Sequence, residues 1–230
     1  MNLRCIVVPA VVLLLVHPWR ACAQESSERA SLPPLLPEAE EIALAESAAP
    51  EDIARDAAIY VLGRDGYTLA RSGRNGFTCL VERSHPASLE PICYDAEGTA
   101  TILPRVLEVA ALRRSGADPA AVRTAIAEGY RVGRFRAPQR PGVAYMLSPA
   151  TRFYNPETGK VEPGHPHVMF YAPYLRNENI GSPGEFGVTG TGMPFVIEEG
   201  SPDAYIVVLV GGAEPCTVGR ADGLVNGMGL

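Results

Sequence analysis

The sequence predicts an α+β fold: an antiparallel sheet built from a four-stranded meander and three to four C-terminal strands, with a helical layer on one face. Apolar and polar residues alternate between residues 57 and 95 and again after residue 142, which is the period of a β-strand. Between residues 102 and 131 the period lengthens to nearly four, as in an amphipathic helix. Because strands and helices come in separate blocks, a parallel α/β fold is the poorer fit.

Two turn signals define the meander. Asp65-Gly66 and Asn75-Gly76 interrupt the alternation, and both dipeptides favour the positive φ angles of tight hairpin turns. They predict three strands joined by short turns within residues 57–83. Residues 92–95 then add the fourth strand.

Four helices are expected from the helical period and from their start signals. Proline is tolerated in the first turn of a helix, and Pro50, Pro104 and Pro119 each stand at such a position. Asp118 is a suitable N-cap for the last helix, because its carboxylate can accept a hydrogen bond from a free backbone N–H group. The expected helices cover residues 38–47, 50–56, 104–114 and 118–130.

Strand patterns return in the last third of the chain, separated by two long loops. The expected strands cover residues 143–147, 167–172, 195–198 and 205–210. Between them, residues 148–166 and 173–193 are rich in Gly, Pro and Asn. Loops of this length in a compact domain are usually functional or disordered. We therefore expect a functional site beneath these two loops.

The N-terminus has the pattern of a signal peptide over residues 1–23. A positive charge at Arg4 precedes an apolar run at residues 6–16, and small residues precede Gln24. Residues 24–36 are polar and then proline-rich, which predicts a linker or disordered lead-in, followed by a single globular domain at 37–230. No segment reaches the ~20 apolar residues of a membrane span, so we expect no transmembrane anchor. The protein is predicted to be periplasmic or secreted.

The charge of the chain excludes one class of partner. The formal net charge is −6 at pH 7, and nothing basic is expected to cluster on one face. An acidic exported chain is a poor candidate for binding nucleic acid. Lys160 is the only lysine while arginine is abundant, which favours a GC-rich bacterial source.

The cysteines predict one disulfide bond. Two of the five cysteines lie in the predicted signal peptide, which leaves Cys79, Cys93 and Cys216. A hairpin centred on Pro86 places Cys79 directly opposite Cys93, and export implies an oxidising compartment in which thiols tend to pair. The alternative is that both are buried free thiols. The state of Cys216 cannot be read from the sequence.

Two of the four histidines suggest a weak metal site. His165 and His167 stand two residues apart before an apolar strand, so both can point to the same side. Pro166 places His165 in the loop, and no third ligand stands at a telling distance, although His85 could supply one if its loop folds back. The alternatives are a ligand contact or a structural hydrogen bond for His167.

A thiol hydrolase is the alternative enzymatic hypothesis. The order Cys79, His167 and Asn177, with a histidine opening a strand in "HVMFYAP", resembles papain-like thiol hydrolases. That resemblance implies a nucleophile, a base and an orienting amide. The segment "FTCLV" departs from it, because those enzymes hold the thiol at a helix N-terminus, whereas this cysteine falls within an expected strand.

The leading hypothesis is a binding module for a small molecule or a protein partner in the cell envelope. Aromatic and histidine side chains gather where the long loops leave the sheet, and the candidates for ligand contact are Tyr145, His167, Tyr171 and Asn177. The glycines of "GEFGVTGTGMP" lack the helix start that cradles a phosphate, so no cofactor is predicted. An exported hydrolase that uses His167 with a metal or with Cys79 is the competing hypothesis.

Overall fold

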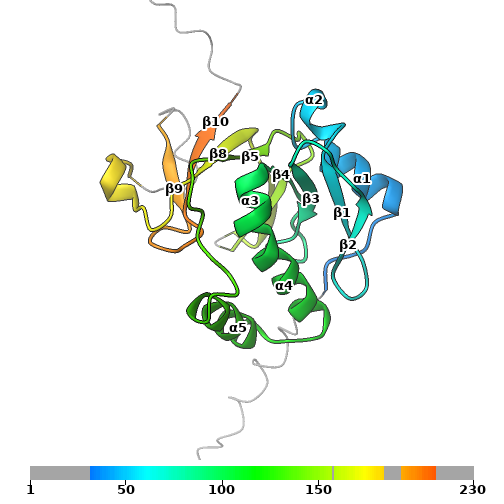
Figure 1. The fold of residues 1–230 in the computed structure, drawn as a ribbon, viewed down its shortest axis with the longest axis horizontal. Helices are drawn as coiled ribbons and strands as arrows, with labels where there is room; N and C mark the ends of the chain where they lie inside the picture. The colour runs from blue at the N-terminus through cyan, green and yellow to red at the C-terminus, as the bar shows by residue number, and fades with distance from the viewer. Residues whose placement is uncertain (1–31, 157, 184–192, 211–230) are drawn as a thin grey trace, which may run out of the picture. The chain divides into compact units, whose positions relative to one another are not determined.

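The computed structural model describes residues 32–156, 158–183 and 193–210. They form an eight-stranded mixed sheet, a two-stranded sheet and five α-helices (Figure 1), which confirms the predicted α+β class. The predicted signal peptide, most of the predicted linker and Cys216 lie outside the described residues. Among the helices of the described residues, none has the length and apolar character needed to cross a membrane.

The helices and strands fall into three blocks along the chain. The first block contains α1 (Glu38–Glu46), α2 (Glu51–Ala54), β1 (Ala58–Leu62), β2 (Tyr67–Arg71), β3 (Thr78–Glu82) and β4 (Glu90–Tyr94). The second contains α3 (Ala96–Thr101), α4 (Leu103–Arg114) and α5 (Pro119–Arg131). The third contains β5 (Val143–Met146), β6 (Arg152–Asn155), β7 (Lys160–Pro163), β8 (His167–Tyr171), the 3₁₀ helix η1 (Asn177–Ile180), β9 (Phe195–Ile197) and β10 (Tyr205–Leu209).

The main sheet has the order β2-β1-β3-β4-β5-β8-β10-β9, with one parallel pair. The hairpins β1–β2 and β3–β4 form as expected, but β3 pairs with β1 in parallel, so the four strands are not a simple meander. The burial of the strands gives the reason. The side chains of β3 are mostly buried and need neighbours on both sides, whereas β2 is mostly exposed and forms the edge.

The β3–β4 hairpin confirms the predicted disulfide. Cys79 and Cys93 are directly opposite each other, with Cα atoms 4.0 Å apart, and their sulfur atoms are bonded. Both side chains are fully buried beneath α1. The bond therefore joins the neighbouring strands β3 and β4 in the interior of the sheet.

The first predicted long loop contains a hairpin that the sequence analysis missed. β6 and β7 pair antiparallel within residues 148–166, and the turn between them ends at Gly159, whose φ of +64° favours glycine. A bridge from Arg152 to Leu89 attaches this hairpin to the loop between β3 and β4. The second predicted loop is described only to residue 183 and from residue 193, and it contains η1.

The helices lie on both faces of the sheet. α4 packs through Leu103 and Val106 on the face that carries Leu80, Ile92 and Tyr94. α1 covers the opposite face near the disulfide, and its small residue Ala45 is fully buried there. The prediction of a helical layer on one face therefore describes the α3–α4 layer and omits α1.

Side-chain caps begin two of the helices. The Asp118 carboxylate accepts a 2.8 Å hydrogen bond from the backbone N–H group of Ala121, as predicted for α5. Asp95 caps α3 in the same way, accepting a 2.9 Å bond from Gly98. The sequence analysis did not predict α3, although Asp95 was a recognisable N-cap signal.

Candidate functional site

The four predicted ligand contacts lie in separate places. Tyr145 is on the face of the sheet that carries the disulfide, where it stacks on Phe77 with ring centroids 6.3 Å apart. His167 and Tyr171 share the opposite face, at the two ends of β8, which places them about 13 Å apart along a strand. Asn177 begins η1 beside β9. The structure does not gather these four side chains around one cavity, and their role in binding stays a prediction.

Three of these side chains, those of His167, Tyr171 and Asn177, form hydrogen bonds within the protein. The Tyr171 hydroxyl lies 3.0 Å from both a carboxylate oxygen of Asp95 and the carbonyl oxygen of Val143. The Asn177 amide donates to the carbonyl of Val196 at 2.8 Å and accepts from its N–H group at 2.7 Å. These contacts join segments that are distant in the sequence, so both residues stabilise the fold.

The two histidines of the weak metal hypothesis have different surroundings. His165 is exposed, whereas His167 is only 5% exposed, and its Nδ1 lies 2.7 Å from the carbonyl oxygen of His165. Burial lowers the pKa of His167. His85 stacks on Tyr154, with ring centroids 3.7 Å apart. Among the described residues, no three His, Cys, Asp or Glu side chains are placed to share a metal ion.

The disulfide removes the proposed thiol nucleophile. Cys79 lies within β3 and its sulfur is bonded to Cys93, so it cannot supply a thiolate. The thiol version of the hydrolase hypothesis is therefore wrong for the oxidised protein.

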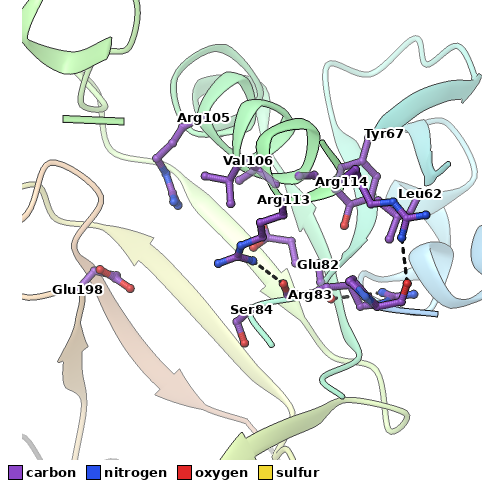
Figure 2. A pocket seen from close by; sticks show the side chains of 13 residues that line it. Leu62, Tyr67, Glu82, Arg83, Ser84, Arg105, Val106, Arg113, Arg114 and Glu198 are labelled. Atoms are coloured by element: carbon purple, nitrogen blue, oxygen red, sulfur yellow. Dashed lines mark hydrogen bonds between the residues drawn. The ribbon is translucent and has the colours of Figure 1, made fainter. Parts of the chain in front are cut away.

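A pocket lies beneath α4 in the described part of the chain. It has a volume of about 200 Å³ and lies between α4, the β1–β2 hairpin and the end of β3 (Figure 2). The hairpin approaches the helix closely, because a Cβ atom added at Gly66 would lie 3.3 Å from the Cα atom of Ala111. Three segments distant in sequence thus enclose one site.

One wall of the pocket is apolar. Val106, Val109 and Ala110 line it from α4, and their spacing of three and four residues places them on one face of the helix. Leu62, the last residue of β1, and Pro33, near the start of the described chain, add apolar surface. A ligand can therefore bury a short hydrocarbon group against this wall.

The opposite wall carries a half-buried carboxylate. Glu82, the last residue of β3, points to the same face as Leu80, and the hydroxyl of the buried Tyr94 donates a hydrogen bond to its Oε1 atom. Burial raises the pKa of Glu82, while the nearby positive charges of Arg105 and Arg113 act in the opposite direction. Within the described residues, no hydrogen bond engages Oε2, the second oxygen of Glu82.

Four arginines line the pocket, and three of them are held by other groups. Arg83 forms an ion pair of 2.9 Å with Glu41, and both side chains are almost fully buried. Arg105 lies 2.9 Å from Asp203, whose other oxygen accepts a hydrogen bond from Tyr130. Arg114 donates to the carbonyl oxygens of Arg64, at 2.9 Å, and Pro33, at 3.1 Å.

Arg113 is the exposed one of the four arginines, and a single hydrogen bond holds it among the described residues. Its Nη1 donates a 2.8 Å hydrogen bond to the carbonyl oxygen of Arg83 (Figure 2). Within the described residues no ion pair involves it, so its remaining N–H groups are available to a ligand. Arg113 and Glu82 are thus two opposite charges of one pocket that form no ion pair within the described residues, although Arg113 is close enough for its charge to lower the pKa of Glu82.

The β6–β7 hairpin supports this wall of the pocket indirectly. The Ser88 hydroxyl accepts a 3.2 Å hydrogen bond from the N–H group of Tyr154. Ser84, which lines the pocket, donates to the buried carboxylate of Glu90, and burial raises the pKa of Glu90 to about 7. The segment between β3 and β4 is therefore held between the pocket and the hairpin.

Sequence reasoning missed Glu82 and Arg113 as site residues. The signals were present, since Glu82 is a charged residue directly after an apolar strand and Arg113 begins a basic pair at a helix end. Only the packing of α4 on β3 brings them together. Comparison with protein-family models, curated proteins and solved structures found no match to this chain.

Proposed function

We propose that this chain is an exported binding protein, periplasmic or secreted, that holds a small charged molecule in the pocket beneath α4. One observation carries the proposal: Glu82 and Arg113 face the same cavity without an ion-pair partner in the described structure, opposite an apolar wall. Small-molecule sites commonly combine an apolar lining with a few convergent polar groups. The pocket has this composition.

Two features support export. Residues 1–23 have the charge, apolar run and small residues of a cleavable signal peptide. The disulfide between Cys79 and Cys93 is of the kind that persists in oxidising compartments. If the signal is cleaved as expected, mass spectrometry of the native protein will find a chain that begins at Gln24. A chain that retains Met1 would contradict this part of the proposal.

The composition of the pocket favours binding over hydrolysis. Its lining contains neither histidine nor cysteine among the described residues, and the hydroxyl of Ser84, its one serine, donates a hydrogen bond to Glu90. His167, the base of the hydrolase hypothesis, is buried on β8, and its Nδ1 is engaged by a carbonyl. The predicted loop at residues 148–166 contains the β6–β7 hairpin. This hairpin supports the pocket wall that contains Ser84.

A substitution that fills the pocket tests the proposal. Ala110→Phe places an aromatic ring against the apolar wall, and Ala127→Phe introduces the same ring at an exposed position of α5 as a matched control. Thermal unfolding is measured with a panel of small carboxylates, amines, zwitterions and sugars. A ligand at 100 times its Kd stabilises the folded state by about 2.7 kcal/mol.

The expected result is that at least one compound raises the melting temperature of the wild type and of Ala127→Phe, but not of Ala110→Phe. Circular dichroism confirms that both variants remain folded. A panel in which no compound shifts the wild type, or in which Ala110→Phe responds like the control, would overturn the proposed function.

A further inference from the structure

Ion pairs neutralise two of the six charged side chains that line the pocket. Arg83 is neutralised by Glu41, and Arg105 by Asp203. Arg114 is held by two backbone carbonyls, and Glu198 lines the pocket from an exposed position. Among the described residues, the lining therefore keeps charges of both signs that no ion pair neutralises: Arg113 and Arg114, Glu82 and Glu198. Glu82, on the strand side, is the more buried of the two carboxylates, and Arg113, an exposed residue on the helix side, has fewer hydrogen bonds than Arg114.

A ligand with a single charge would satisfy only one of these two residues. A bound anion would pair with Arg113 but meet the carboxylate of Glu82, and a bound cation would have the reverse difficulty. Because like charges in a partly buried site repel, a molecule that carries both signs is the better complement. The available Oε2 atom of Glu82 accepts from an ammonium group, and the N–H groups of Arg113 donate to a carboxylate.

The size of the pocket limits the ligand. At about 30 Å³ for each water molecule, a volume of 200 Å³ holds about seven non-hydrogen atoms. The apolar wall formed by Val106, Val109 and Ala110 leaves room for a short hydrocarbon side chain. A free amino acid with a small apolar side chain has this size and both charges.

We propose that the pocket beneath α4 binds a zwitterion of amino-acid type, with its ammonium group on Glu82, its carboxylate on Arg113 and its side chain against the apolar wall of α4. This inference rests on the proposed function and names the class of ligand for the same site. It assigns recognition roles to two residues that lie far apart in the sequence and on different elements of the fold.

Calorimetric titration with matched small molecules tests the charge requirement. Glycine, alanine and valine carry both charges, propionate lacks the ammonium group of alanine, and ethylamine lacks its carboxylate. Losing a hydrogen bond between charged partners corresponds to a change in affinity of about tenfold or more. Alanine or one of its two neighbours is therefore expected to bind at least about tenfold more tightly than propionate or ethylamine. Equal binding of alanine and propionate would overturn the inference.

Two conservative variants test the assigned residues. Glu82→Gln keeps an acceptor for the Tyr94 hydroxyl, and Arg113→Gln keeps a donor for the carbonyl of Arg83. Each is expected to weaken amino-acid binding about tenfold or more, and Glu82→Gln should also remove the preference over propionate. Arg123→Gln, at an exposed position of α5, is the matched control and should bind like the wild type. Unchanged affinity in the two pocket variants would overturn the assignment.

The outcomes separate this inference from the proposed function. If no amino acid binds, but another compound of the panel binds to the wild type and not to Ala110→Phe, the zwitterion inference is overturned and the proposed function stands. If no compound binds at all, both are overturned.

Discussion

The two halves of the main sheet differ in the charge of the polar side chains that they bury. In the half formed by β2, β1, β3 and β4, helices α1, α3 and α4 pack against the strands, and several charged side chains are buried at the strand ends. In the half formed by β5, β8, β10 and β9, the buried polar groups are mostly neutral. Those of His167, Tyr171 and Asn177 bond to nearby backbone or carboxylate groups.

The difference shows where an unsatisfied charge can persist. A neutral polar side chain is satisfied by one or two hydrogen bonds, and the C-terminal half provides them. A buried carboxylate such as Glu82 or Glu90 keeps a desolvation penalty even when it is bonded, which is why burial raises the pKa of both. Groups of this kind at a cavity are candidates for function, because a ligand can supply the missing partner.

The largest expected effect concerns the disulfide that holds the N-terminal half together. The bond between Cys79 and Cys93 closes a loop of about 15 residues, for which the chain-entropy model gives ~3 kcal/mol of stabilisation. Cys79→Ala and Cys93→Ala are each expected to lower the free energy of unfolding by about this amount in urea titrations. The double variant should be no less stable than either single one. Additive losses would show that the two side chains act separately.

A gain of stability is expected from Glu90→Gln. Between pH ~4.5 and about 7 the unfolded chain has lost the Glu90 proton while the folded chain keeps it, so this residue lowers stability as the pH rises. A shift from 4.5 to about 7 corresponds to at most about 3 kcal/mol. Glutamine keeps an acceptor for Ser84 and carries no charge.

The measurement is the free energy of unfolding at pH 4 and at pH 8. Glu90→Gln should match the wild type at pH 4 and exceed it at pH 8, by up to about 3 kcal/mol. Glu178→Gln changes an exposed residue of η1 in the same way and serves as the control. A variant that is less stable than the wild type at both pH values would show that the Glu90 carboxylate stabilises the N-terminal half.

Local sequence patterns predicted strands and a disulfide bond in the two halves of the sheet. The four C-terminal strands of the main sheet lie within a residue or so of their expected positions, because alternation and flanking turn residues are local signals. The Cys79–Cys93 bond was predicted for the same reason, since it depends on a single hairpin. Local patterns were therefore reliable in both halves.

The features that were missed depend on contacts between distant segments. The parallel pairing of β1 with β3 depends on the burial of β3. The turn signal at Asn75-Gly76 carries no information about that burial. The pocket requires α4 to pack over β3, so Glu82 and Arg113 meet across 30 intervening residues. The sequence analysis predicted ligand contacts for aromatic and histidine residues near the long loops because such side chains often contact ligands. In the structure Tyr171 and His167 are buried, and packing within the protein is a sufficient reason for both.

A moderate loss is expected from Tyr171→Phe in the C-terminal half. The hydroxyl lies within hydrogen-bonding distance of the Asp95 carboxylate and the Val143 carbonyl, and a bond to a charged group contributes about 1.5 to 3 kcal/mol. The free energy of unfolding should therefore fall by about 2 kcal/mol. Tyr174→Phe removes a hydroxyl from a tyrosine that is 62% exposed and should have almost no effect. Equal losses in the two variants would show that the internal bonds of Tyr171 carry no particular weight.

The smallest effect distinguishes the two histidines. His167 is buried and bonded through Nδ1, so His167→Ala is expected to lower stability by about 1 kcal/mol at pH 8, whereas the exposed His165 tolerates alanine. Because burial lowers the pKa of His167, the unfolded chain binds the proton first as the pH falls below about 6.5, and the wild type loses stability there. His167→Ala should lack this component of the acid sensitivity, and His165→Ala should keep it.

Metal analysis of the same two variants completes this comparison. With a purely local hydrogen bond at His167, the wild type and both variants contain no stoichiometric zinc, and a chelator leaves their unfolding curves unchanged. Zinc in the wild type that disappears on replacing either histidine would mean that His165 and His167 act together, which requires His165 to move from its exposed position to the side of the buried ring. The carbonyl of His165, which an alanine keeps, accepts the contact from His167 in the structure, so we expect the two substitutions to behave independently.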